Sequence, residues 1–194
     1  ALAFGDILTG SEYPLTWAHN GVPALLCLLF ALLMQIDANF INDFYDCLKG
    51  TDREDRLGPK RACAEGWITL EAMKHGIAAT TIACCAVGLP LLLYTGWHGI
   101  WIGVACVAFA FLYTTRLSYL GLGDVLVIVF FGLVPVGATY FAQLYPRTFN
   151  SDAPALTWEA LLAGLVVGLV TDNLLIVNNF RDREQDKLSG QNTL

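Results

Sequence analysis

The chain has 194 residues, of which 56% are hydrophobic and only 14% are charged, and its formal net charge is −6. Soluble globular proteins carry about 25% charged residues. Together with a mean hydropathy of +0.55, this composition excludes a disordered tail and a secreted disulfide scaffold, and the lack of a basic field excludes a nucleic-acid binder. The remaining class is a polytopic membrane protein.

Six apolar segments follow one another along the chain, and each approaches the roughly 20 residues that a helix needs to cross the hydrocarbon layer. They cover approximately residues 1–17, 21–41, 74–95, 97–115, 122–145 and 155–178. These runs are apolar on every side, so the expected fold is all-α, a polytopic transmembrane helical bundle. The chain begins inside an apolar stretch and stops after a polar cluster. We therefore expect one membrane-embedded domain over 1–194, incomplete at both ends, with a truncated first span.

The basic residues predict which side of the membrane each connection faces. Ten of the eleven Lys and Arg residues lie in or beside the segments that follow the second, fourth and sixth spans, and only Arg147 lies on the other side. By the positive-inside rule these segments are cytoplasmic. We expect a multi-pass protein of the cell inner membrane whose motif loops, 42–67 and 179–194, face the cytoplasm.

Two polar clusters with nearly the same five-residue motif end the second and sixth spans. Asn42-Asp43-Phe44-Tyr45-Asp46 closes the second span, and Asn178-Asn179-Phe180-Arg181-Asp182 closes the sixth. Residues three or four apart share one face of a helix. The expected stripes are Asn39, Asn42, Asp43 and Asp46, and Asn178, Asn179, Asp182 and Asp186. The repetition predicts two related halves whose ends meet at one site.

Two facing carboxylate stripes suit hard divalent cations. Mg²⁺ prefers carboxylate and amide oxygens and is commonly completed by substrate phosphates. Such ions would clamp a diphosphate and neutralise the charge that develops as it departs. The expected metal ligands are Asn42, Asp43, Asp46, Asp182 and Asp186, and the expected diphosphate contacts are Lys49, Lys60, Arg61 and Arg181. Isolated loop acids such as Glu54, Asp55, Glu65 and Glu184 are interpreted as solvated surface charges.

With these motifs the sequence resembles the UbiA-type membrane prenyltransferases. Their N-D-x-x-D and D-x-x-x-D motifs stand here at Asn42–Asp46 and Asp182–Asp186. Within that superfamily the chain is most similar to the branch that prenylates 1,4-dihydroxy-2-naphthoate in menaquinone biosynthesis. The segments that carry the similarity are Lys49–Asp52, Arg56–Arg61, Tyr119–Asp124 and Asn178–Leu194. Asp37 and Ile176 depart from the usual pattern. The resemblance implies a fold of nine spans, of which six would be present.

The resemblance also implies an activity. A polyprenyl group would pass, with Mg²⁺ as cofactor, from a polyprenyl diphosphate to 1,4-dihydroxy-2-naphthoate with loss of CO₂, giving demethylmenaquinol. The prenyl chain would reach the site through an opening to the membrane lipid. The expected catalytic residues are Asp43, Asp46, Asp182 and Asp186, with Asp124 orienting the acceptor or a basic side chain. Asn39, Asn178, Asn179 and Tyr119 complete the expected substrate-binding set, Tyr119 through its aromatic face.

Two other interpretations stay open. The first is a prenyltransferase of the same fold with another acceptor, such as 4-hydroxybenzoate, homogentisate, chlorophyllide or haem. The sequence of the Gly58–Arg61 segment favours the naphthoate branch. The second is a transporter or cation channel that uses the intramembrane carboxylates Asp37 and Asp172. A transporter or cation channel would have little need for the basic segment 49–61.

Overall fold

A computed structural model describes residues 20–50, 60–115, 122–148 and 156–189, and side chains are described there except at 114–115, 145–148 and 184–189. In these ranges the chain is helical, which confirms the all-α expectation. The elements in chain order are α2 (Val22–Lys49), α3 (Leu70–Thr95), α4 (His98–Thr115), α5 (Gly123–Val127), the π-helix η3 (Ile128–Leu133), α6 (Val134–Thr148) and α7 (Trp158–Ser189).

Four of these helical stretches are long and apolar enough to cross a membrane: Val22–Lys49, Leu70–Thr95, Gly123–Leu144 and Trp158–Arg183. The predicted span at 97–115 is also an apolar helix, but its apolar part, His98–Tyr113, is shorter. The predicted first span, 1–17, lies outside the described residues. The expectation of six spans is therefore met only in part.

The boundaries of the helices differ from the apolar runs at their polar ends. Helix α2 continues to Lys49 and α7 to Ser189, so the beginnings of the segments expected as loops, 42–67 and 179–194, are helical. Helix α3 begins at Leu70 because the Thr69 hydroxyl accepts a hydrogen bond from the amide of Ala72 at 3.2 Å and caps the first turn. Hydropathy finds the apolar part of a helix, whereas caps decide where it ends.

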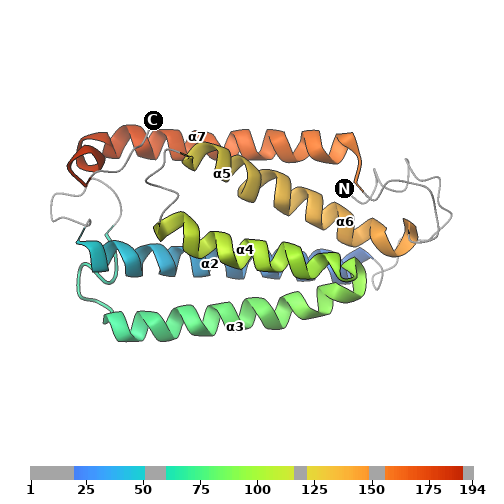
Figure 1. Cartoon of the computed structure of the whole chain (residues 1–194), viewed down its shortest axis with the longest axis horizontal. Coiled ribbons are helices and arrows are strands. Elements are labelled where there is room, and N and C mark those ends of the chain that lie inside the picture. Colours follow the sequence, from blue (N-terminus) through green and yellow to red (C-terminus); the bar gives the residue numbers. More distant parts are fainter. Residues whose placement is uncertain (1–19, 51–59, 116–121, 149–155, 190–194) are drawn as a thin grey trace.

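The helices form two groups that meet along the bundle. Helix α2 packs against α3, α4 and α6, whereas α7 packs against α5, η3 and α6. Figure 1 shows α2, α3, α4 and α7 running along the long axis of the molecule, with α3 and α7 at opposite edges of this view. The segment α5–η3–α6 lies between them and connects the two groups.

Two backbones approach closely at the π-helical segment of the predicted span 122–145. A Cβ atom on Gly132 would overlap the backbone of Gly164 and Gly168 in α7, and one on Gly168 would lie 2.7 Å from the carbonyl oxygen of Ile128. Small residues allow membrane helices to approach in this way. The wider turn of η3 lies where these backbones meet.

Asp37 joins two helices at membrane depth. Its side chain is fully buried, and its two oxygens accept hydrogen bonds from the hydroxyls of Thr80 and Thr81 on α3, the second at 2.9 Å. A carboxyl inside a bilayer is stable only with such partners. Asp37 therefore holds α2 to α3, and this use of both oxygens favours a structural role over the ion pathway of the transporter interpretation.

Candidate functional site

The first aspartate motif occupies the last two turns of α2. The helix ends at Gly50, whose φ of +64° allows its amide to bond the carbonyl oxygens of Asp46 and Cys47. Below this end lies a buried cluster drawn from α2, the following turn, α3 and α4: Ile41, Phe44, Cys63, Met73, Ile77 and Ala110. This cluster supports the helix end, so the motif stands on a packed element rather than on a loose loop.

Asp43 connects α2 to the turn that precedes α3. Its Oδ2 accepts a hydrogen bond from the amide of Ala62 at 3.0 Å, and its Oδ1 accepts one from the amide of Cys63 at 3.2 Å. Only 7% of the residue is exposed. Each oxygen keeps a further lone pair, so these bonds orient the carboxylate and leave it able to bind a cation.

The same turn brings a basic side chain to Asp46. The guanidinium of Arg61 lies 3.5 Å from the Asp46 carboxylate, and both side chains are about three-quarters buried. Lys60 points elsewhere: its ammonium bonds Glu65 at 3.0 Å and is largely exposed. Of the two basic residues predicted here as diphosphate contacts, the structure brings Arg61 to the motif and pairs Lys60 with a surface acid.

The turn also determines the chemistry of Cys63. Burial raises the pKa of the Cys63 thiol above its ordinary value, and the negative charge of Asp43 and the neighbouring Cys47 raise this pKa further. A thiolate is the reactive form of cysteine. Cys63 is therefore a packing residue with low reactivity, held against the carboxylate that its own amide bonds.

The second motif lies in the last part of α7. Arg181 donates two hydrogen bonds to Asp182, from Nε to Oδ1 and from Nη2 to Oδ2, each at 2.7 Å. This forked geometry is the strong form of an arginine–carboxylate pair. Arg183 turns away and stacks over the Phe180 ring at 5.1 Å from its centroid.

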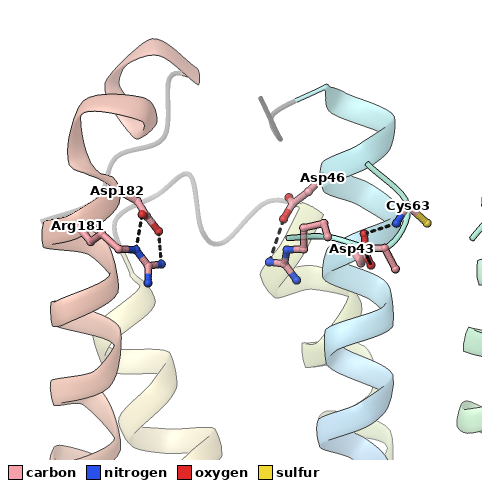
Figure 2. Close-up of polar contacts among 7 residues, drawn as sticks. Asp43, Asp46, Cys63, Arg181 and Asp182 are labelled. Atoms are coloured by element: carbon pink, nitrogen blue, oxygen red, sulfur yellow. Dashed lines mark hydrogen bonds and ion pairs between the residues drawn. The ribbon is translucent and has the colours of Figure 1, made fainter. Parts of the chain in front are cut away.

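The two motifs lie at the same end of the bundle. The carboxyl ends of α2 and α7 lie at the same end of the bundle in Figure 1, and Figure 2 shows Asp46 and Asp182 turned toward one another from these two helices in that view. Each carboxylate carries its own arginine, Arg61 for Asp46 and Arg181 for Asp182. The result is a set of two acids and two guanidinium groups that belong to parts of the sequence far from one another.

The other predicted site residues are distributed as follows. Asn39 is exposed, and its amide bonds the carbonyl oxygen of Gln35 in its own helix at 2.8 Å. Asn42 is half-buried beside Asp43, as are Asn178 and Asn179 before Asp182, while Lys49 is exposed in the last turn of α2. Asp124 lies in the first turn of α5. Asp186 belongs to α7, but its side chain lies outside the described residues, as does all of Tyr119.

The chemistry of the donors fits a hard cation. Asp43, Asp46 and Asp182 offer carboxylate oxygens, which are the ligands that Mg²⁺ prefers. Among the described side chains, no three His, Cys, Asp or Glu residues gather into a group that would hold a metal by themselves. The oxygens of Asp46 and Asp182 are instead close to the guanidinium groups of Arg61 and Arg181.

Sequence reasoning missed the two backbone bonds of Asp43 and the partners of the intramembrane acids. The bonds of Asp43 cross 19 and 20 residues of chain. In the sequence, the sign of the turn that makes these two bonds is Gly66, whose φ in the structure is +71°. A glycine can suggest a turn, but it does not show which carboxylate the turn will contact.

The chain is similar to known proteins over most or all of its length. Over the full length of this chain, its identity is 36% to the 1,4-dihydroxy-2-naphthoate octaprenyltransferase of Haemophilus influenzae and 34% to that of Escherichia coli, covering 64% and 63% of those proteins. The protein of the same name from Mycobacterium leprae is 34% identical over 92% of this chain and 59% of its own length. The chain thus spans about three fifths of these relatives.

No solved structure matches the chain. The UbiA prenyltransferase family matches residues 5–194, a range that contains both aspartate motifs and every described helix. The chain therefore belongs to the UbiA prenyltransferase family, whose members are multi-pass membrane proteins.

Proposed function

We propose that the full-length protein transfers a polyprenyl group from a polyprenyl diphosphate to 1,4-dihydroxy-2-naphthoate, with loss of CO₂, to form demethylmenaquinol in menaquinone biosynthesis. Family membership and the names of the relatives from Haemophilus influenzae and Escherichia coli support this reaction. The observation that carries the proposal is the placement of Asp46 and Asp182, each beside an arginine, at the same end of the bundle.

The aspartate motifs would hold Mg²⁺, the proposed cofactor, and through it the diphosphate of the donor. The proposed ligands are Asn42, Asp43, Asp46, Asp182 and Asp186. When bound, the metal neutralises charge on the departing diphosphate. The chain's own part is to fix the carboxylates in place: the amides of Ala62 and Cys63 orient Asp43, and the cluster around Ile41 supports the end of α2.

The arginines beside the motif supply the contacts that a diphosphate requires. Arg61 and Arg181 already lie at the two carboxylates, and a guanidinium group matches two phosphate oxygens at once. Lys49, exposed in the last turn of α2, and Lys60 are the further proposed contacts. Asn39, Asn178, Asn179 and Tyr119 remain proposed substrate-binding residues.

After the carbon–oxygen bond to the diphosphate breaks, the electron-rich acceptor ring attacks the allylic carbon, and the ring carboxylate leaves as CO₂. Asp124 is the proposed residue that orients the acceptor. The prenyl chain extends along the apolar helices toward membrane lipid. We place the motif end of the bundle on the cytoplasmic side of the inner membrane, because ten of the eleven basic residues lie on that side of the predicted topology.

The experiment that tests this proposal supplies purified full-length protein in lipid with labelled polyprenyl diphosphate, Mg²⁺ and one acceptor at a time. We expect product with 1,4-dihydroxy-2-naphthoate, none after EDTA, and little with 4-hydroxybenzoate or homogentisate. Equal turnover in metal-free buffer would contradict the metal clamp. A preference for 4-hydroxybenzoate or homogentisate would replace the acceptor while keeping the donor chemistry.

A further inference from the structure

Two carboxyl groups meet inside the membrane, away from both motifs. Asp124 belongs to the first turn of α5, and Asp172 lies on α7, ten residues before Asp182 and so about 15 Å along the helix from it. Helix α5 packs against α7, and a Cβ atom on Gly123, the neighbour of Asp124, would lie 3.4 Å from the Leu175 side chain, one turn beyond Asp172. The two acids therefore lie close together between these helices, within range of electrostatic interaction.

The pair has acceptor positions that the protein does not use. Asp172 is only 7% exposed, and the Oδ1 atoms of both Asp124 and Asp172 are buried without a hydrogen-bonding partner among the described residues. Buried polar atoms in native proteins are nearly always paired, because an unpaired one loses its hydration without compensation. Two buried oxygens of this kind are suited to a ligand that donates hydrogen bonds.

Aromatic side chains line the same region. The Tyr113 hydroxyl would lie 3.8 Å from a Cβ atom on Gly123, the neighbour of Asp124. The ring of Tyr113 lies 5.4 Å from that of Phe109, which stacks on Phe130 with 3.7 Å between centroids. Flat rings beside two buried oxygen acceptors match a flat aromatic molecule that carries hydroxyl groups.

We propose that Asp124 and Asp172, with Tyr113 beside them, form the subsite that binds a hydroxyl group of the aromatic acceptor. This inference rests on the proposed prenyl transfer and adds Asp172 and Tyr113 to it. The hydroxyl donates to the free oxygens of the pair, whereas the pair offers no positive charge to the acceptor's ring carboxylate. The subsite therefore orients the acceptor, hydroxyl toward the pair and carboxylate away from it, and selects for hydroxylated rings.

The test measures binding without catalysis. Full-length protein in nanodiscs, with EDTA and without prenyl donor, is titrated with 1,4-dihydroxy-2-naphthoate and with 2-naphthoate, which keeps the carboxylate and lacks the hydroxyls. We expect the hydroxylated ring to bind about tenfold more tightly to the wild-type protein, since a hydrogen bond to a charged group carries the difference. In Asp172→Leu this preference falls to less than about threefold, the size of a weak residual contact.

Two further variants separate recognition from simple loss of structure. Asp172→Asn keeps an oxygen acceptor and can donate to Asp124, so it retains most of the preference. Thr171→Val is the matched control, because the Thr171 hydroxyl bonds the carbonyl oxygen of Val167 at 2.9 Å within its own helix. This variant keeps the wild-type preference.

The inference is overturned if wild-type protein binds both naphthoates equally, or if Asp172→Leu keeps the full preference. Should Asp172→Leu fail to fold, the comparison of the two ligands on wild-type protein and on Asp172→Asn still decides the matter. Failure of the proposed function is a separate result: wild-type protein then forms no prenylated product when Mg²⁺ and donor are added, whatever the binding preference.

Discussion

At the scale of single residues, the site contains acids that look alike in sequence and differ in their surroundings. Asp43 is held by two backbone amides, Asp46 and Asp182 each face an arginine, and Asp37 binds two threonine hydroxyls. A carboxylate with an arginine beside it can exchange that partner for a cation. One bonded by two threonines inside the membrane has a packing role.

Asp46→Asn and Asp182→Asn should each reduce turnover by orders of magnitude while leaving expression largely unchanged. Each substitution is nearly isosteric but removes a full negative charge from a proposed metal site. The matched control is Glu71→Gln, because Glu71 is 69% exposed and pairs with Lys74 on the surface. The control should change the rate by less than about threefold, roughly 0.6 kcal/mol of barrier.

Prenyl transfer by the full-length variants at saturating Mg²⁺ measures this difference. If the aspartate variants and Glu71→Gln lose activity equally, the motifs are only solvated helix ends. Partial recovery of Asp46→Asn or Asp182→Asn at raised Mg²⁺ would locate the defect in metal affinity.

Cys63 should alkylate slowly, with a rate that still climbs above about pH 8.5, where an unperturbed thiol is half ionised. Its pKa is raised by burial, by Asp43 and by Cys47, so the reactive thiolate forms only at higher pH. The measurement is the pH profile of maleimide labelling in a variant whose other cysteines are alanine.

Asp43→Asn should accelerate this labelling at every pH. The substitution removes the charge that disfavours the thiolate and replaces an acceptor of the Cys63 amide, so the turn is held less firmly. A Cys63 that reacts like an ordinary thiol in the parent protein would show that the turn is not packed against α2.

At the scale of elements, the contact between η3 and α7 depends on glycines. Gly132→Ala should lower thermal stability and the yield of folded protein, because the added methyl group would overlap the backbone of Gly164 and Gly168. Gly103→Ala in α4 is the matched control, since a Cβ atom there meets nothing within 4 Å. Alanine favours helix over glycine by up to about 1 kcal/mol, so the control should be neutral or slightly stabilising.

Thermal denaturation of both variants in one detergent tests this contrast. Equal melting temperatures for Gly132→Ala and Gly103→Ala would mean that η3 and α7 can separate without loss.

At the scale of the whole molecule, apolar runs predicted where the described helices lie but not their polar ends. The run at 21–41 stops where Asn42 begins, yet α2 continues to Lys49, because a helix already in place extends through polar residues with good caps. The π-helical turn at Ile128–Leu133 packs against glycines of α7, more than 30 residues away. Hydropathy carries no information about such a neighbour.

The site was predictable to the same degree. The spacing of Asp43 and Asp46, and the similar motif at Asp182, predicted acids at two helix ends, and the structure has both of these at the same end of the bundle. The partners of those acids were not predictable, because Ala62 and Cys63 meet Asp43 through a turn whose shape depends on tertiary packing. The link between Asp124 and Asp172 likewise requires two helices to be placed before it can be seen.

The orientation of the bundle has a direct test. A cysteine at Ala64, exposed in the turn beside the motif, should react only with reagent on the cytoplasmic side of right-side-out vesicles, in full-length protein without native cysteines. A cysteine at Trp97, 62% exposed between α3 and α4, should react only from the opposite side. Labelling with the two sides exchanged would invert the proposed topology.

The pairing of Asp46 and Asp182 each with an arginine has a thermodynamic consequence. Asp46 with Arg61, and Asp182 with Arg181, each sum to zero charge, so neither pair attracts a free cation or a free anion strongly. In the proposed function, a divalent ion that took the acids would release the guanidinium groups, and a diphosphate that took the guanidinium groups would release the acids. Each ligand would thus prepare the site for the other, and by linkage Mg²⁺ would raise the affinity for diphosphate by the same factor by which diphosphate would raise the affinity for Mg²⁺. The donor and its metal would arrive as cooperative partners, which keeps the resting protein from accumulating either one alone.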